Sequence, residues 1–264
     1  MTNVSSGTSA AGRLVRHLAM VAGLFGAAAG CGDDRPLGEA QYVPDPVAAD
    51  LLSTAEAAGS GAMSQATGQG APAGSNQSLD IAALGYNEGP EGAPVRVIEF
   101  SDFGCGYCRR FHMESYPVLV QEYMDQGKVE WKYIPMILGM FPNAMEAARA
   151  GECAGEQGAF PVMRDLLFER QADWKRSDEP EPVLEGFAEE LELDMDQFRS
   201  CVDEGRQDAR IQAGTRLSQQ AGVRGTPTFF VVGYAPIPGA IPLELFRSAL
   251  DTVYNQAMRE SGGG

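Results

Sequence analysis

The sequence has few positive charges and no long apolar segment. It carries 20 Lys and Arg against 36 Asp and Glu in 264 residues, a net charge of −16, and has no basic stripe interleaved with aromatic residues. This balance argues against a nucleic-acid-binding protein. The apolar run near the N-terminus, "LAMVAGLFGAAAG", spans 13 residues. A helix that crosses a bilayer needs about 20, so a permanent membrane span is not expected.

Residues 1–30 have instead the pattern of a signal peptide. Arg13 and Arg16 precede the apolar run, and small residues follow it. A basic start, a short apolar segment and small residues at its end are typical of export. The run ends in Ala-Ala-Gly-Cys, which resembles a bacterial lipobox, although Ala28 stands where Leu is usual. Cys31 is therefore predicted to be a lipid anchor on the periplasmic or outer cell surface. Ordinary cleavage after Ala29 is the alternative.

Residues 31–79 are predicted to be a flexible linker, either lipid-anchored or free at its N-terminus. They are rich in Ala, Gly, Ser, Gln and Pro and contain one aromatic residue, Tyr42. Such a composition buries too little apolar surface to offset the entropy lost on ordering. A tether between a lipid anchor and a folded domain is physically sensible, and compositional drift without a role is the alternative.

Residues 80–260 are predicted to form one folded domain of the α/β class. Buried or alternating patterns predict strands at 93–100, 128–136 and 226–233. A helix is expected from 105 to 126 with a kink at Pro117, and a last helix from 242 to 258. Residues 142–222 divide into helical pieces, with Asn143 and Asp194 as plausible caps. The domain is therefore expected to be an α/β sandwich that encloses a helical insertion.

The pattern Cys-x-x-Cys at Cys105 and Cys108 is open to several interpretations. Haem attachment would need His after the second cysteine, where Arg109 stands, and a four-cysteine zinc site would usually have a second close pair. A redox pair has a physical basis, because Cys105 would lie where a strand ends and a helix begins. Unpaired N–H groups and the helix dipole stabilise a thiolate there. We therefore expect an exchangeable disulfide with one exposed sulfur.

A second motif, "GTPTFFV" at residues 225–231, completes a resemblance to a known family. Pro227 begins a strand, which suits a residue that cannot donate to a sheet. Together with "EFSDFGCGYC" at residues 99–108, it resembles the DsbA-like thioredoxin-fold thiol:disulfide oxidoreductases. The resemblance implies a thioredoxin-like fold whose helical insertion, about 142–222, lies between the second strand and the strand of a cis-proline.

The resemblance also implies roles for single residues. Thr226 and a cis-Pro227 would face the cysteines and hold the substrate chain, and Glu99 would be a buried acid that assists proton transfer at Cys108. Many DsbA proteins have Pro-His between the cysteines, whereas Gly106-Tyr107 stand here and resemble the dipeptide of the isomerase DsbC. A weaker oxidant than DsbA is therefore expected.

Each of the remaining cysteines and polar residues has a structural interpretation and a functional one. Free thiols are unusual in exported proteins, so Cys153 and Cys201 are predicted to form a structural disulfide, with buried thiols or a second redox pair as alternatives. His112 is expected to be a partly exposed helix residue rather than a charge partner of the site. Arg109 and Arg110 are expected to be solvated. The "PMILGMF" stretch at 135–141 is expected to be core, with a peptide-binding lip as the alternative.

These patterns predict an exported thiol–disulfide oxidoreductase that forms disulfides in exported proteins and needs no metal or organic cofactor. Its expected partners are cysteine-containing substrate proteins, a membrane or soluble redox partner, and the membrane itself through a lipid anchor. A reductase or isomerase on the same fold, or a non-enzymatic binding module, is the alternative.

Overall fold

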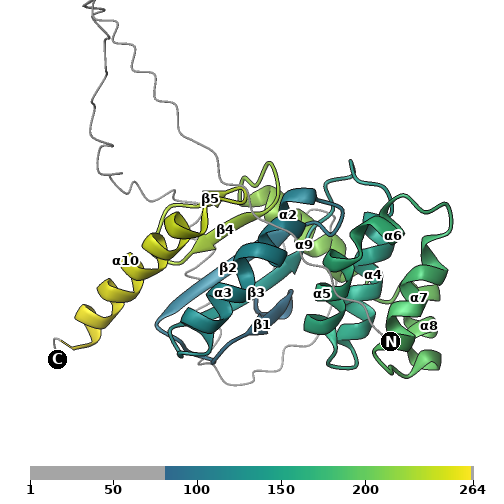
Figure 1. Ribbon diagram of the computed structural model, residues 1–264, viewed down its shortest axis with the longest axis horizontal. Coiled ribbons are helices and arrows are strands. Elements are labelled where there is room, and N and C mark those ends of the chain that lie inside the picture. The colour runs from purple at the N-terminus through teal and green to yellow at the C-terminus, as the bar shows by residue number, and fades with distance from the viewer. Residues whose placement is uncertain (1–80, 263–264) are drawn as a thin grey trace, which may run out of the picture. The chain divides into compact units, whose positions relative to one another are not determined.

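The computed structural model describes residues 81–262, which are built around one mixed sheet (Figure 1). The predicted signal peptide, linker and Cys31 lie outside the described residues. The strands are β1 (Tyr86–Glu88), β2 (Val95–Ser101), β3 (Val129–Pro135), β4 (Thr228–Val231) and β5 (Ile237–Pro238). Their order in the sheet is β1-β3-β2-β4-β5; β2 and β3 are parallel, and the other neighbours are antiparallel.

The helical run after β2 changes its hydrogen-bond pattern before Pro117. It begins with α2 (Gly106–Arg110), widens into a π-helical segment at Phe111–Ser115, returns to α3 (Tyr116–Leu119) and widens again at Val120–Met124. At the first junction the Tyr116 N–H donates to the Phe111 carbonyl. Pro117 has no N–H and its ring disfavours a regular preceding turn. The expected interruption at Pro117 is therefore present as a local widening of the helix.

The predicted helical block between β3 and β4 is confirmed. It consists of α4 (Ala144–Gly155), α5 (Phe160–Glu169), α6 (Gln171–Lys175), α7 (Pro180–Glu190), α8 (Met195–Asp203) and α9 (Asp208–Gln220). Asp194 caps α8 by accepting the Gln197 N–H at 3.0 Å. Asn143 precedes α4 but makes no capping bond; its side-chain amide instead donates to the carbonyls of Trp174 and Ser177. Asn143 thus occupies the predicted N-cap position of α4, but its side chain does not cap the helix. Helix α10 (Leu243–Ser261) follows β5.

Both faces of the sheet are covered by helices, as the predicted α/β sandwich requires. On one face Trp131 of β3 and Phe229 of β4 pack with Phe111 and with Phe246 of α10. On the other face the buried residues of β2, β3 and β4 pack with Leu217 of α9. Alternate strand residues point to opposite faces, and this alternation separates the two cores.

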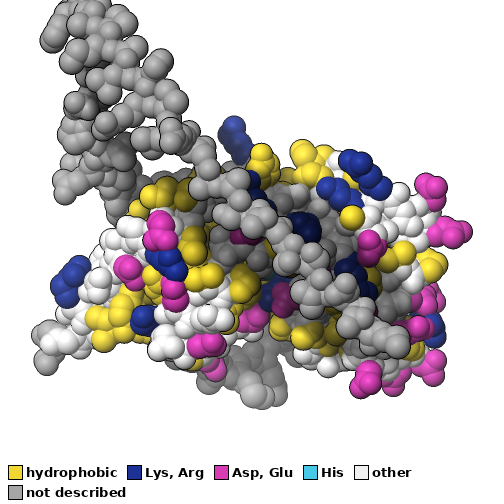
Figure 2. Space-filling model, in the orientation of Figure 1, with side chains coloured by type: hydrophobic (Ala, Val, Ile, Leu, Met, Phe, Trp, Pro, Cys, Tyr) yellow, Lys and Arg dark blue, Asp and Glu magenta, His cyan; other side chains and the backbone are white. Residues whose placement is uncertain are grey.

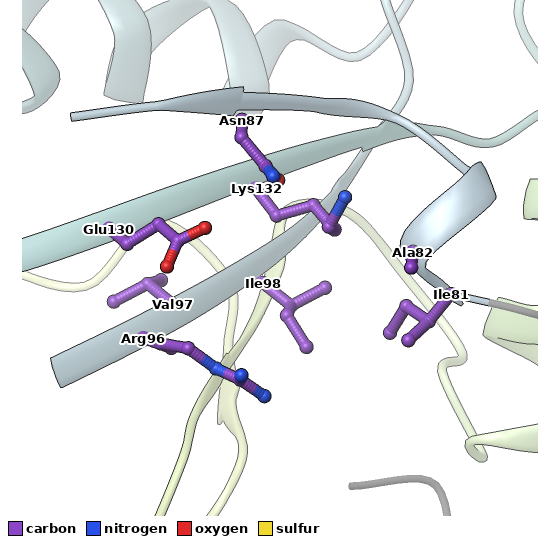
Figure 3. A pocket seen from close by; sticks show the side chains of 8 residues that line it. All are labelled: Ile81, Ala82, Asn87, Arg96, Val97, Ile98, Glu130 and Lys132. Carbon is purple, nitrogen blue, oxygen red and sulfur yellow. The ribbon is translucent and has the colours of Figure 1, made fainter. Parts of the chain in front are cut away.

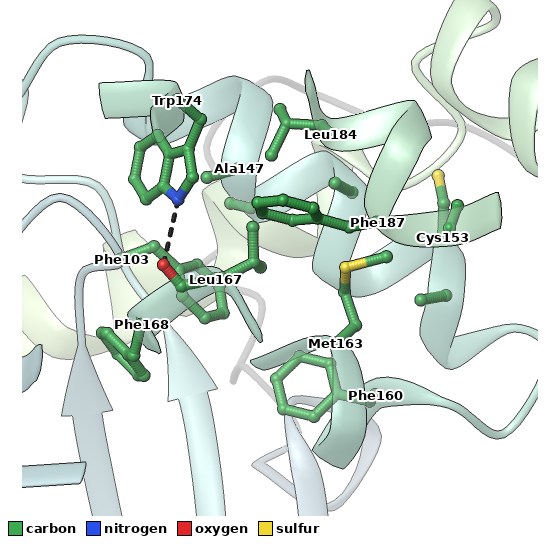
Figure 4. Close-up of a cluster of buried hydrophobic side chains, with 14 of the residues drawn as sticks. Phe103, Ala147, Cys153, Phe160, Met163, Leu167, Phe168, Trp174, Leu184 and Phe187 are labelled. Carbon is green, nitrogen blue, oxygen red and sulfur yellow. Dashed lines mark hydrogen bonds between the residues drawn. The ribbon is translucent and has the colours of Figure 1, made fainter. Parts of the chain in front are cut away.

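A third core fills the helical block and reaches the loop after β2 (Figure 4). Trp174 donates its Nε1–H to the Leu167 carbonyl at 2.9 Å, and both side chains are fully buried. Phe103, two residues before Cys105, packs in the same cluster and lies 5.2 Å from Phe168, measured between ring centroids. Packing of the helical block therefore fixes the loop that carries Cys105.

Surface features away from the cysteines are less specific. Acidic side chains gather over α7 and α8, at the right of Figure 2. A hollow of about 170 Å³ lies between Ile81 and the sheet, with Arg96 and Lys132 among its lining residues (Figure 3). None of the predicted site residues lines it. In the described part of the chain, no helix combines the length and apolar character needed to cross a membrane.

Candidate active site

Cys105 lies at the start of α2, where β2 has just ended. Its backbone is extended, with φ −78° and ψ 124°, and it occupies the N-cap position. The Cys108 N–H donates to the Cys105 sulfur at 3.4 Å, so the sulfur accepts one of the N–H groups left unpaired in the first turn. The Cys105 N–H in turn donates to the Asp102 carbonyl at 2.9 Å. The predicted junction of strand and helix under the cysteine pair is present.

Cys108 lies one turn further into the helix and is fully buried. The two sulfurs are free thiols in this structure. Cys105 is itself only 3% exposed, so the expectation of one exposed sulfur is wrong. Packing in the third core accounts for this, since both cysteines belong to that cluster. Tyr107, between them, is 60% exposed and is the solvent-facing residue of the motif.

The two thiols differ strongly in acidity. A hydrogen bond from the Cys108 side chain, assisted by N–H groups of α2, lowers the pKa of Cys105 to about 6. Burial raises the pKa of Cys108 well above its ordinary value. A thiolate is the nucleophile and also the better leaving group in exchange. Cys105 is therefore the thiolate at neutral pH, and Cys108 must give up its proton before it can attack.

The loop before β4 faces the cysteines from 121 residues away in the chain. The Thr226–Pro227 peptide bond is cis, and the Cys105 thiol lies 3.3 Å from the Thr226 carbonyl oxygen, to which it donates. The Pro227 carbonyl accepts the Gly239 N–H at 2.7 Å, and β4 begins only at Thr228. Proline cannot donate to the sheet, so the strand starts after it.

Two polar residues that the sequence did not single out hold the loop between β2 and α2. Asp102 is buried, and its carboxylate accepts the N–H groups of Gly104 at 2.8 Å and Leu138 at 2.9 Å. Burial raises its pKa to about 6 despite these bonds. Gln171 of α6 donates to the Cys105 carbonyl at 3.1 Å and also to that of Phe103. Asp102 stands inside the quoted motif, whereas nothing in the local sequence marks Gln171.

Glu99 is fully buried in the middle of β2. Its Oε2 accepts a hydrogen bond from Trp131 Nε1–H at 3.0 Å, and its Oε1 lies 2.9 Å from His112 Nε2. His112 is buried, with 1% of its side chain exposed, and its ring stacks on Phe168 at 4.6 Å. The expected partly exposed His112 is therefore wrong, because α5 covers the helix face on which it lies.

The other residues singled out from the sequence lie around this centre or apart from it. Cys153 and Cys201 form a disulfide that joins α4 to α8. Arg109 is exposed, yet its guanidinium donates to the Phe168 carbonyl at 2.9 Å. The side chains of the 135–141 stretch differ in burial: Met136 is buried, whereas Met140 is 68% exposed.

Known proteins with similar sequences and structures fit this arrangement. A family model described as thioredoxin matches residues 86–252. A probable disulfide bond formation protein D of Bacillus anthracis is 29% identical over 153 residues, which cover 55% of this chain and 68% of that protein. The crystal structure of Wolbachia pipientis alpha-DsbA1 superposes with a TM-score of 0.62 at 21% identity, covering 69% of this chain and 96% of that one.

A further similarity is to part of a much longer protein. The Na⁺/H⁺ antiporter NhaA 1 of Salinispora arenicola is 38% identical over 147 residues, which cover 55% of this chain but only 21% of the antiporter. This chain thus spans about a fifth of that relative's length. The family model covers more than half of the chain, and the sheet order, the cysteine pair at a strand–helix junction and the facing cis-proline agree with it. The chain therefore belongs to the thioredoxin family, with the fold of its DsbA-like members.

Proposed function

We propose that this protein is an exported thiol–disulfide oxidoreductase that forms disulfides in cysteine-containing substrate proteins. The observation that carries the proposal is the asymmetry of the cysteine pair. Cys105 has a pKa of about 6 and lies against the cis-proline loop, whereas Cys108 is buried and has a raised pKa. The name of the Bacillus anthracis relative, a probable disulfide bond formation protein, points in the same direction.

The exchange balances in two steps. A substrate thiolate attacks the Cys105 sulfur of the oxidised enzyme; a substrate–Cys105 disulfide forms, and Cys108 leaves and takes up a proton. A second substrate thiolate then attacks the substrate sulfur of this mixed disulfide, and Cys105 leaves as a thiolate. The substrate has lost two electrons and the enzyme has gained them. A membrane or soluble redox partner that carries a more oxidising group must reoxidise the enzyme.

Thr226 and Pro227 are proposed to hold the substrate chain beside Cys105. The Thr226 carbonyl oxygen lies 3.3 Å from the Cys105 sulfur. A substrate strand that adds to this loop by backbone pairing would bring its cysteine to the Cys105 sulfur. Met140 and Tyr107, both largely exposed, offer apolar contact to side chains next to the substrate cysteine. No metal or organic cofactor is required by this chemistry.

The protein's location and domain organisation are part of the proposal. Residues 1–30 would be removed on export, Cys31 would carry a lipid, and residues 31–79 would tether the 80–260 domain to the membrane surface. The full-length chain should then partition into detergent with its lipid, and a Cys31→Ser variant should appear in the soluble fraction. Equal membrane association of the two would reject the anchor and leave the enzyme proposal untouched.

Oxidative refolding of a reduced, disulfide-containing protein tests the function. The oxidised enzyme should accelerate disulfide formation, and Cys105→Ser should abolish the acceleration. Cys108→Ser cannot form the Cys105–Cys108 disulfide and should not oxidise the reduced substrate; offered a disulfide-containing substrate instead, its Cys105 thiolate should attack that disulfide and accumulate a mixed disulfide that no Cys108 can displace. Full activity of Cys105→Ser would reject an enzyme and favour a binding module. Activity only on proteins with wrongly paired disulfides would favour an isomerase.

A further inference from the structure

The buried polar atoms without a hydrogen-bond partner are concentrated around the cysteine pair. In the described part of the chain they are Ser101 Oγ, His112 Nδ1, Tyr133 Oη and Thr226 Oγ1. More than nine tenths of buried polar groups in proteins are paired, so such a concentration calls for an explanation. Thr226 belongs to the cis-proline loop already described. The other three lie beneath the cysteines.

These three groups and Glu99 lie close together in an otherwise apolar core and define a polar path, in which His112 Nε2 and Glu99 are within hydrogen-bond distance and the two hydroxyls have no hydrogen-bond partner. Glu99 and Ser101 are two residues apart on β2 and so point to the same face of the sheet. Tyr133 of β3 is the direct partner of Glu99 in the parallel ladder. The Ser101 hydroxyl neighbours both the Cys108 thiol and the Tyr133 hydroxyl. A proton on Cys108 therefore has hydroxyl groups between it and the Glu99 carboxylate.

His112 connects the far end of this path to the surface. Its Nε2 lies 2.9 Å from the Glu99 carboxylate, and its ring centroid is 5.6 Å from that of Tyr133. On the other side, His112 lines a hollow of about 490 Å³ together with Tyr116, Arg164 and Phe168. The second Glu99 oxygen is occupied by Trp131, which carries no exchangeable site of use in proton transfer at neutral pH. The imidazole is thus the group between the buried carboxylate and the hollow.

We propose that His112 is a positioning and proton-relay residue that carries a proton between Glu99 and the solvent-facing hollow whenever Cys108 loses or gains its thiol proton. This inference rests on the proposed exchange at Cys105 and Cys108. When Cys108 attacks a mixed disulfide at Cys105, a Cys105–Cys108 bond forms and the bond from Cys105 to the substrate sulfur breaks. The substrate leaves as a thiolate, and the Cys108 proton passes through the hydroxyls to Glu99.

The imidazole then resets the carboxylate. Nε2 takes the proton from Glu99 while Nδ1 releases another toward the hollow, so one proton has left Cys108 and one has entered solvent. Loss of the Cys108 proton needs such help, since burial holds the pKa of Cys108 well above its ordinary value. The titratable and charged groups that face His112 or its hollow are Glu99, Cys108, Tyr116, Tyr133, Glu88, Asp125, Arg164, Asp165 and Glu169.

Ellman's reagent, 5,5′-dithiobis(2-nitrobenzoate), separates the two thiols without a protein substrate. Attack by the Cys105 thiolate releases one thionitrobenzoate, and attack by Cys108 on the resulting mixed disulfide releases a second. Stopped-flow absorbance from pH 5 to 9 follows both phases in the whole protein. The variants are His112→Gln, Tyr133→Phe and His112→Gly with added imidazole. Tyr116→Phe is the matched control, because Tyr116 lies beside His112 but its hydroxyl contacts Arg164 instead of the path.

The second phase should slow by about tenfold or more at pH 7 in His112→Gln and Tyr133→Phe, since general acid–base groups typically contribute about 10²–10⁴. The first phase and the control should stay within about twofold, and imidazole should restore part of the second phase in His112→Gly. An unchanged second phase, or equal slowing of both phases, or equal slowing in Tyr116→Phe, would overturn the relay. A first phase that persists unchanged in Cys105→Ser would show that Cys105 is not the attacking thiolate, and would instead overturn the proposed function.

Discussion

Raising the pH should stabilise the reduced protein relative to the oxidised one. In the folded, reduced protein, hydrogen bonds headed by that from Cys108 lower the pKa of Cys105 from 9.0 to about 6. A folded-state pKa below the unfolded value gives stability that is fully present above the unfolded pKa and is lost as the pH falls through the folded one. The window is therefore pH 6 to 9. The oxidised protein has no titrating thiol at Cys105, so the difference between the two forms isolates this group.

The size of the effect follows from the shift. About three pKa units correspond to about 4 kcal/mol, of which about 3 kcal/mol would develop between pH 5 and 8.5. The raised pKa of Cys108 acts in the opposite sense only as the pH approaches 9, which sets the upper limit of the scan. Asp102 titrates in both forms and largely cancels.

Urea unfolding of the reduced and oxidised proteins at each pH measures the difference. A thiol count of two in the reduced sample, or of three where Cys31 is present and unmodified, verifies that the Cys153–Cys201 disulfide has stayed intact. The free energy of unfolding of the reduced form minus that of the oxidised form should rise steadily from pH 5 to 8.5. A difference that stays constant within about 0.5 kcal/mol, or that falls with pH, would refute the acidity assigned to Cys105.

Three further changes test the surroundings of the site. Asp102→Asn should become less destabilising relative to wild type as the pH rises from 4 to 6, by on the order of 2 kcal/mol. Burial raises the pKa of Asp102 from 3.8 to about 6, so in this range the carboxyl ionises in the unfolded chain but not in the folded protein, and the wild type loses stability; parallel pH profiles would contradict this. In Gly104→Ala the free energy of unfolding should fall by about 1–3 kcal/mol, since the added Cβ would overlap Phe141. The Cβ added in Gly106→Ala has no atom within 4 Å, so this variant serves as the control in the same thermal melts. Replacing both Cys153 and Cys201 by Ala should lower the free energy of unfolding by about 4 kcal/mol, because it removes a cross-link over 48 residues. The Ellman kinetics of Cys105 should stay unchanged; altered kinetics would show that this disulfide acts on the site.

The sequence was informative where the chemistry is local. The strand that ends before Cys105, the helix that begins after it and the strand after Pro227 all follow from patterns within about ten residues. The helical block was likewise predictable from successive apolar periodicities and caps such as Asp194. Strand β1 was missed, because its three residues, Tyr86–Glu88, have no alternation and are ordered only by pairing with β3.

Residues that depend on distant packing could not be found in this way. Gln171 bonds the Cys105 carbonyl, 66 residues away in the chain. The Asn143 side chain does not cap α4 and instead donates to carbonyls more than 30 residues away. His112 was expected to be a partly exposed helix residue, because nothing near it in the sequence shows what covers it; Phe168, 56 residues later, covers its ring. Its role beside Glu99 became visible only once both faces of the helical run were known.

The reduction potential of the Cys105–Cys108 pair tests the central claim most directly. The pair lacks the histidine that makes DsbA strongly oxidising, yet its Cys105 thiolate is stabilised, so we expect a weaker oxidant than DsbA with a potential of about −180 mV. Equilibration with glutathione buffers, followed by the unfolding or fluorescence difference between the two forms, measures it. A value near about −180 mV supports donation of disulfides to exported proteins, whereas a value below about −250 mV would contradict it and identify a reductase.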